Sequence, residues 1–171
     1  MSERAEFFIK GRDLLAEPYQ FHASGLDDIF LLNGVSETDT PYGPMVHIHN
    51  VHGLHRAIGL HIAEKPQLMT GAEFRFLRRQ IELTQSDLAK RMCITDQTIA
   101  NYEKGKTKLG SADPFMRTLY LVHILPEQTR VGILKPMIEE SVATSRKRLP
   151  DVARTSIVEG WSEARQRARA G

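Results

Sequence analysis

A short polar stretch, TDQTIANYEKG over residues 95–105, carries side chains that could read a nucleic acid. The candidate reading residues are Asp96, Gln97, Thr98 and Asn101. Gln and Asn amides can pair bidentately with adenine, Thr can hydrogen-bond or touch a thymine methyl group, and Asp can accept from cytosine N4. Ile99 and Tyr102 would give this helix one narrow apolar edge. The same polar types are common on ordinary surfaces, so the flanking sequence decides between the two interpretations.

A second group that could do chemistry is a run of histidines. The four members are His47, His49, His52 and His55. The first two would point to one side of a strand, and the last two lie three residues apart on a helix. Three imidazoles could hold Zn²⁺ or Ni²⁺. Because the local cluster contains no Cys or carboxylate, we expect surface or interface histidines, with no metal and no other cofactor. A metal-responsive protein is kept as an alternative.

Enzyme activity is not expected. The single cysteine, Cys93, lies within a helical segment and is expected to fill a small gap in the core rather than act as a nucleophile. Ser24-Gly25 and Asn33-Gly34 indicate turns, and we find no glycine-rich loop that could cradle a phosphate. A lone cysteine also excludes an intramolecular disulfide framework, which fits a reducing cytoplasm.

The composition is that of an ordinary soluble globular protein. Of the 171 residues, 41% are hydrophobic and 26% are charged, and the net charge is +2. The first residues carry charges throughout, unlike a signal peptide. No apolar run approaches the length of a membrane span. A cytoplasmic location with no membrane contact is therefore expected.

Residues 1–68 are predicted to form a small α+β domain. Strand-favouring runs include Tyr19–Phe21 and Ile29–Leu32, on either side of the Ser24-Gly25 turn. A polar loop is expected over residues 36–44, followed by a half-buried strand over Met45–His49. From Gly53 onwards the period becomes helical, with an apolar face of Leu54, Ala57, Ile58 and Ile62.

Residues 69–125 are predicted to form an all-α domain of four helices. Thr70 with Glu73 forms a capping box, Thr84 opens a second helix in the same style, and Thr95 caps a third. The third is expected to end at Gly105, which suits a left-handed backbone. Asp113 is predicted to cap the fourth helix, ahead of Pro114 in its first turn. The predicted apolar residues of these helices are Phe74, Leu77, Ile81, Leu88, Ala89, Met92, Ile99, Tyr102, Phe115, Leu119 and Val122.

Residues 126–171 are predicted to be a helical extension with a basic tail, which could serve in dimerisation. Pro136 must break or kink any helix in its neighbourhood. The spacing of Ile157, Trp161 and Ala164 suggests one amphipathic helix, with Trp161 as a packing anchor.

The segment LTQSDLA…TDQTIANYEKGKT resembles the helix-turn-helix of the Cro/phage-repressor type, also called the xenobiotic-response-element family. The features that match are Leu83, Gln85, Leu88, Ala89, Ile99, Glu103 and Gly105. In this motif the second helix enters the major groove. The resemblance implies that Gln85 binds DNA and that residues 96, 97, 98 and 101 read bases. Cys93 departs from the family, which usually has Gly in the turn.

Basic residues around the motif could contact phosphates. The candidates are Arg75, Arg78, Arg79, Lys90, Arg91, Lys104, Lys106 and Lys108. Arg75 and Arg78 could instead simply form a solvated helix face. Free amides at the start of the helix at Thr84 could also receive a phosphate.

Together these features favour a bacterial or phage-type homodimeric transcriptional regulator, with an inverted-repeat operator in double-stranded DNA and nucleoid association when DNA-bound. The opening FRFLR…LTQ is also similar to the helix-turn-helix half of MqsA/YgiT-type antitoxins. That similarity leaves an alternative in which a toxin or another protein partner is bound and the operon is autoregulated. The paired Cys-x-x-Cys zinc motifs of those antitoxins do not occur here.

Overall fold

A computed structural model describes residues 4–126, 129 and 161–163. These residues separate into two compact units. The first runs up to Ile58 and includes residues 161–163, and the second begins at Gly59. The dividing point falls within helix α1 (Val51–Glu64), which therefore contributes its first turns to one unit and its last turns to the other. The architecture is α+β, with the strands at the amino-terminal end followed by the helices, as predicted.

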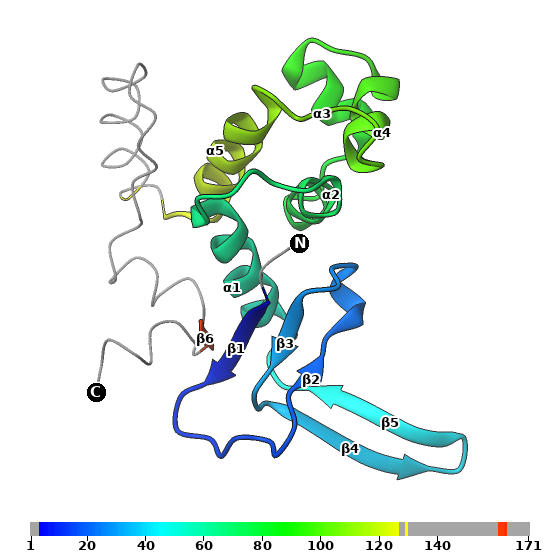
Figure 1. The fold of residues 1–171 in the computed structure, drawn as a ribbon, viewed down its shortest axis with the longest axis vertical. Coiled ribbons are helices and arrows are strands. Elements are labelled where there is room, and N and C mark those ends of the chain that lie inside the picture. The colour runs from blue at the N-terminus through cyan, green and yellow to red at the C-terminus, as the bar shows by residue number, and fades with distance from the viewer. Residues whose placement is uncertain (1–3, 127–128, 130–160, 164–171) are drawn as a thin grey trace. The chain divides into compact units, whose positions relative to one another are not determined.

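The amino-terminal unit contains a four-stranded sheet with the order β2-β3-β1-β6 (Figure 1). Its strands are β1 (Ala5–Ile9), β2 (Tyr19–Gln20), β3 (Ile29–Leu31) and β6 (Trp161–Glu163). β1 and β3 are parallel, whereas β2 and β6 pair antiparallel with their neighbours. Trp161 is opposite Ile9 in this sheet, so its prediction as part of an amphipathic helix is wrong. The predicted companions of Trp161, Ile157 and Ala164, lie outside the described residues, as does Pro136.

The core of the amino-terminal unit follows the two-residue period of its strands. Ala5 and Phe7 of β1 and Ile29 and Leu31 of β3 are buried, and the residues between them are partly exposed. β1 was not predicted because its alternating pattern is short. The turn after β2 is a single 3-10 turn, His22–Ser24, closed by Gly25 at φ 72°, which agrees with the predicted Ser24-Gly25 turn.

A hairpin replaces the polar loop that was predicted over residues 36–44. β4 (Val35–Thr40) pairs antiparallel with β5 (Gly43–Ile48), and Ser36 lies opposite His47. The strand expected at Met45–His49 is thus present, but its side chains are mostly exposed rather than half-buried. Because both faces of this hairpin meet solvent along much of its length, neither strand shows the apolar alternation that normally identifies a strand.

The second unit contains α2 (Gly71–Gln80), α3 (Gln85–Met92), α4 (Asp96–Glu103) and α5 (Ala112–Ile124). α2 packs against both α4 and α5, and α3 packs against α4 (Figure 1). The side chains at the centre of this unit are fully or almost fully buried: Phe74, Leu77, Leu88, Ile99, Met116 and Tyr120. The four helices predicted between residues 69 and 125 are therefore confirmed. Among the described residues, no helix is both long enough and apolar enough to cross a membrane.

α5 buries a different face from the predicted one. Its buried apolar residues are Ala112, Met116 and Tyr120, whereas Phe115 is exposed and Leu119 and Val122 are only half-buried. Asp113 is not the N-cap either, because the helix begins at Ala112, with Ser111 in the cap position. The apolar pattern is ambiguous here, since two stripes of similar hydrophobicity run along the helix, and packing against α2 selects one of them.

Asp113 and Arg117 form a buried ion pair at the centre of the helical unit. Arg117 Nε and one terminal nitrogen donate to the carboxylate of Asp113. The terminal nitrogens also donate to four backbone carbonyls, those of Ile62, Ala63, Lys65 and Gln67. Asp113 Oδ2 also accepts from the backbone N–H of Met69 at 2.8 Å. This pair therefore ties α5 to the end of α1 and to the connection that leads into α2.

Candidate nucleic-acid interface

α3 and α4 cross closely because a small residue lies at their contact. Leu88 and Ala89 of α3 and Ile99 of α4 are at most 1% exposed. The other residue of the predicted apolar edge, Tyr102, has its ring edge-on to Phe74 of α2, with 5.9 Å between ring centroids. Tyr102 thus helps hold α4 against α2, while Ile99 holds it against α3.

The turn between α3 and α4 has the left-handed backbone that its position requires. Cys93 has φ 55° and ψ 39°. The N–H of Ile94 donates to Ala89 O at 3.0 Å, and that of Cys93 donates to Lys90 O at 3.2 Å, which is the Schellman arrangement. A non-glycine residue in this conformation costs roughly 1–2 kcal/mol. The Cys93 side chain is exposed, so the prediction that it fills a core gap is wrong.

Threonines cap the helices of the motif, as predicted. Thr95 Oγ1 accepts from the N–H of Thr98 at 3.2 Å, and Thr84 Oγ1 accepts from that of Asp87 at 3.0 Å. The Thr84 hydroxyl donates in return to Asp87 Oδ2 at 2.6 Å. Hydrogen bonds from the side chain and the backbone N–H of Thr84 lower the pKa of Asp87. A carboxylate therefore already accepts from the amide of Thr84, one of the groups predicted to receive a DNA phosphate.

The polar side chains of α4 lie on the side of the helix away from its buried edge. Asp96 and Gln97 are exposed, and Thr98 and Asn101 are half-buried. Gln97 Nε2 donates to Asn101 Oδ1 at 3.1 Å, so the two amides lie next to each other one turn apart. The hydroxyl of Thr98 is within 2.9 Å of that of Thr95. The four residues predicted to read bases thus share one accessible surface at the amino-terminal end of α4.

A buried charged cluster supports this surface from behind. Arg78 of α2 donates from Nε to Glu103 Oε1 at 2.6 Å and from a terminal nitrogen to Oε2 at 3.1 Å. It also donates to Leu83 O at 2.6 Å, and Gln85 Nε2 donates to Glu103 Oε2 at 2.8 Å. Arg78 is only 8% exposed, so its prediction as a phosphate contact is wrong. The sequence did contain a signal for the burial of Arg78, because Arg78 lies one turn after Phe74, on the same face of α2 as this buried residue.

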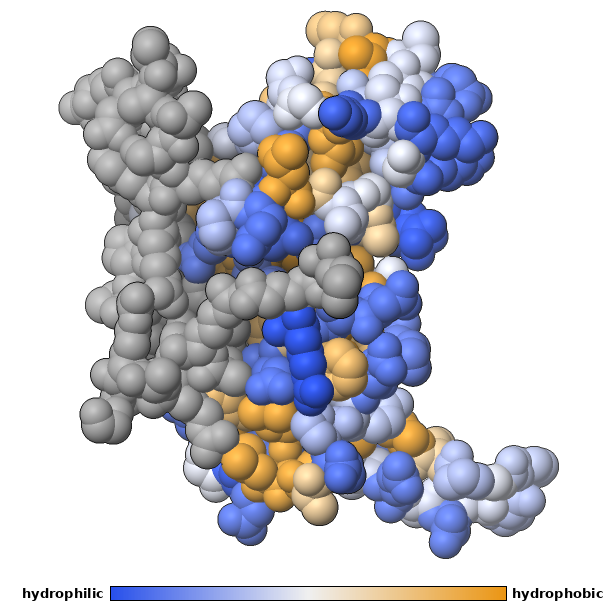
Figure 2. All heavy atoms as spheres, viewed as in Figure 1, coloured by the Kyte–Doolittle hydropathy of each residue, from blue (hydrophilic) through white to orange (hydrophobic). Residues whose placement is uncertain are grey.

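Most of the other basic residues of this unit are exposed. Exposed cations of this unit are Arg79, Lys90, Arg91, Lys104, Lys106 and Lys108, and Arg75 is half-buried. Gly105 has φ 68°, the left-handed backbone that ends α4. Figure 2 shows hydrophilic residues over much of the region where α4 lies.

Gly71 lies where the backbone of α2 passes close to that of α4. A Cβ at this position would lie 2.3 Å from the backbone oxygen of Tyr102 and 2.8 Å from that of Glu103. Gly71→Ala should therefore lower the free energy of unfolding by about 1–3 kcal/mol, because two backbones must separate. Helix propensity alone predicts the opposite sign. Urea unfolding of the variant decides between them, and a gain in stability would contradict the close packing.

The histidines do not assemble into a metal centre. His47 and His49 lie on and just after β5, whereas His52 and His55 lie on α1. Within the part of the chain that the structure describes, no three His, Cys, Asp or Glu residues come close enough to hold a metal ion. Burial, followed by the nearby His52, lowers the pKa of His55, whose ring lies 6.0 Å from that of Phe21.

Two short helices joined by a tight turn, with the second presenting a polar face, define a helix-turn-helix DNA-binding domain. Residues 74–111 match the family model described as helix-turn-helix, and this segment is a helix-turn-helix domain of the Cro type. No curated protein and no solved structure matches the chain.

Proposed function

We propose that this protein is a sequence-specific transcriptional regulator that binds double-stranded DNA by inserting α4 into the major groove. The observation that carries the proposal is the accessible polar surface of α4, where the Gln97 and Asn101 amides are hydrogen-bonded to each other. Amides at this end of the second helix are placed where the motif contacts base edges. Their mutual bond restricts their rotamers before DNA is bound, which lowers the entropic cost of recognition.

The buried cluster behind α4 would fix the angle at which the helix is presented. Arg78 and Glu103 join α2 to the end of α4, and Gln85 joins the start of α3 to the same carboxylate. One N–H of the Gln85 amide is thus used within the protein. The rest of that amide would contact the phosphate backbone next to the groove, whereas both donors of Thr84 are used by Asp87. The lysines at 104, 106 and 108 would add electrostatic affinity that falls with salt.

We further propose that the protein acts as a dimeric repressor on an inverted repeat. In helix-turn-helix dimers the half-sites lie one helical turn, or a multiple of it, apart. The amino-terminal unit and the chain after residue 125 would form the dimer contacts and thereby set this spacing. Repression by occupying its own promoter would then need no catalytic group.

Selection of binding sites from random duplex DNA with the full chain tests this function. A dimeric regulator should enrich a consensus with two-fold symmetry. Enrichment of a single asymmetric half-site would exclude the inverted repeat while retaining sequence-specific binding. Recovery of unenriched DNA would count against the proposal as a whole.

Removing either amide from α4 should weaken operator binding. Gln97→Ala and Asn101→Ala are each expected to cost about 1–3 kcal/mol of binding free energy and to relax specificity at one base pair. Fluorescence anisotropy with the selected operator and its single-base variants measures both effects. The matched control is Gln20→Ala, which removes an amide side chain in the amino-terminal unit. It should leave the affinity for the operator unchanged. Unaltered binding by both α4 variants would refute the assignment of this surface.

A further inference from the structure

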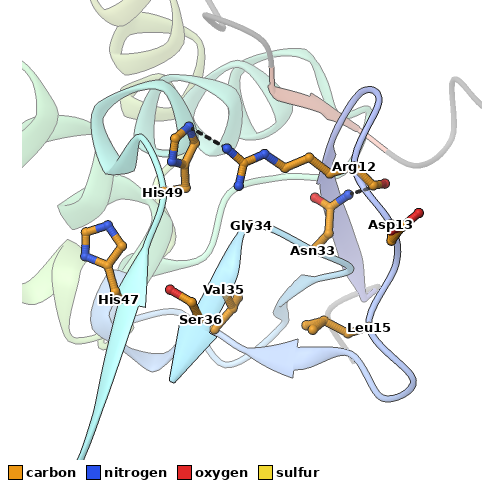
Figure 3. Close-up of a pocket in the computed structure, with 9 residues that line it drawn as sticks. All are labelled: Arg12, Asp13, Leu15, Asn33, Gly34, Val35, Ser36, His47 and His49. Atoms are coloured by element: carbon orange, nitrogen blue, oxygen red, sulfur yellow. Dashed lines mark hydrogen bonds between the residues drawn. The ribbon is translucent and has the colours of Figure 1, made fainter. Parts of the chain in front are cut away.

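A hollow of about 210 Å³ lies in the amino-terminal unit, between the end of β1 and the base of the β4–β5 hairpin (Figure 3). Its polar and charged lining residues are Arg12, Asp13, Asn33, Ser36, His47 and His49. Arg12 and Asp13 follow β1, and Asn33 follows β3. Ser36 and His47 belong to the two strands of the hairpin, and His49 comes directly after β5. Because β1 and β3 are parallel, the segments that follow them meet at the same edge of the sheet.

A buried asparagine fixes the backbone on one side of this hollow. Asn33 is 2% exposed. Its Oδ1 accepts from the N–H of Ile9 at 2.7 Å, and its Nδ2 donates to the carbonyls of Ile9 and Arg12, both at 3.1 Å. The chain reverses just before Arg12 through Gly11, at φ 78°. The start of the Arg12 side chain is therefore held in place by the fold.

The hairpin fixes the other side. The N–H of His49 donates to Gly34 O at 2.9 Å, and Ser36 is paired with His47 across the two strands. His47 and His49 are two residues apart, so they project to the same side of the chain. An Arg12 terminal nitrogen lies 3.1 Å from His49 Nε2, and Figure 3 shows the guanidinium reaching across to this ring.

The charge of Arg12 distinguishes this hollow from an ordinary surface depression. Arg12 forms no salt bridge with a carboxylate in the described part of the chain, although its neighbour Asp13 also lines the hollow. A guanidinium has five N–H donors in a fixed plane, and the contact with His49 uses one of them. The remaining donors, with two imidazoles and the hydroxyl of Ser36, form a set suited to the oxygens of an anion.

We propose that this hollow binds a small oxyanion, the phosphate or carboxylate group of a small molecule, with Arg12 as its main ligand. His49 would position the guanidinium, and His47 and Ser36 would complete the donor set from the hairpin. Such a ligand would join the loop after β1 to the hairpin base through contacts that the protein alone lacks. The amino-terminal unit would then be an effector-binding unit, distinct from the DNA-binding surface.

Amide chemical shifts of the ¹⁵N-labelled full chain, titrated with inorganic phosphate and separately with acetate, test the proposal. Ionic strength is held constant with sodium chloride. At least one of the two anions should cause saturable shifts centred on residues 12, 34, 36 and 49, and the anion that does so identifies the ligand group. The absence of saturable shifts with both anions would overturn the proposal.

Variants at the hollow separate a specific site from general attraction to positive charge. Arg12→Gln should weaken binding about tenfold or more, since a hydrogen bond to a charged group contributes roughly 1.5–3 kcal/mol. Lys10→Gln removes an exposed cation two residues away and should leave the affinity unchanged. His49→Phe, which removes the group that orients the guanidinium, should weaken binding to a smaller extent. Equal weakening by Lys10→Gln and Arg12→Gln would show non-specific attraction and overturn the site.

Discussion

Arg117→Met is expected to lower the free energy of unfolding by about 3–5 kcal/mol, since it leaves a buried charge without its partner. Asp113 is 0% exposed and Arg117 is 5% exposed. The substitution also removes the donor from four backbone carbonyls, and two of these belong to the last turn of α1, at Ile62 and Ala63. A helix end of this kind needs partners for its carbonyls when water cannot reach them.

Urea unfolding followed by far-ultraviolet circular dichroism measures this effect. Arg91→Met, which removes an exposed cation from α3, is the control and should change stability by less than about 0.5 kcal/mol. A second variant, Arg117→Met with Asp113→Leu, tests the origin of the loss. It removes both charges but also removes the hydrogen bonds to the Met69 N–H and to the four backbone carbonyls, so little stability should return. A full recovery would show that the backbone contacts contribute nothing.

Arg78→Met is the second substitution with a large expected effect, again about 3–5 kcal/mol of unfolding free energy. Glu103 would remain buried with only the Gln85 amide as a partner. Here the double variant Arg78→Met with Glu103→Met should recover most of the loss, because outside the pair it removes hydrogen bonds only to the Leu83 carbonyl and the Gln85 amide, and apolar side chains of similar length can fill its volume. The two buried ion pairs are thus predicted to differ in whether hydrophobic residues can replace them.

The Arg78 variants also connect stability to DNA recognition. Arg79→Met removes the exposed neighbouring cation and is the matched control, which should leave stability nearly unchanged. If the cluster orients α4, the double variant should remain folded yet bind operator DNA more weakly, since Gln85 loses its partner. Stability equal to that of the wild type in the single variant Arg78→Met would contradict the buried pair.

Local signals in the sequence were sufficient for the DNA-binding domain. Its helix boundaries are set by groups a few residues apart, such as Thr70 with Glu73, Thr95 with the Thr98 amide, and Gly105 with its left-handed backbone. The exposed face of α4 could also be predicted, since a polar face opposite a narrow apolar edge follows from the helical period. Hydrogen bonds and periodic patterns between residues a few positions apart depend little on the rest of the chain.

Only the tertiary structure decided how long, charged side chains are used. From sequence alone Arg78 is interpreted as a surface cation and Asp113 as a helix cap. In the structure Arg78 is buried against Glu103 of α4, and Asp113 is buried against Arg117, one turn later on α5. The hairpin over residues 35–48 and the pairing of β1 with β6 were likewise beyond sequence patterns. The physical reason is that burial of a charge or exposure of a strand is determined by what packs against it, and that information lies far along the chain.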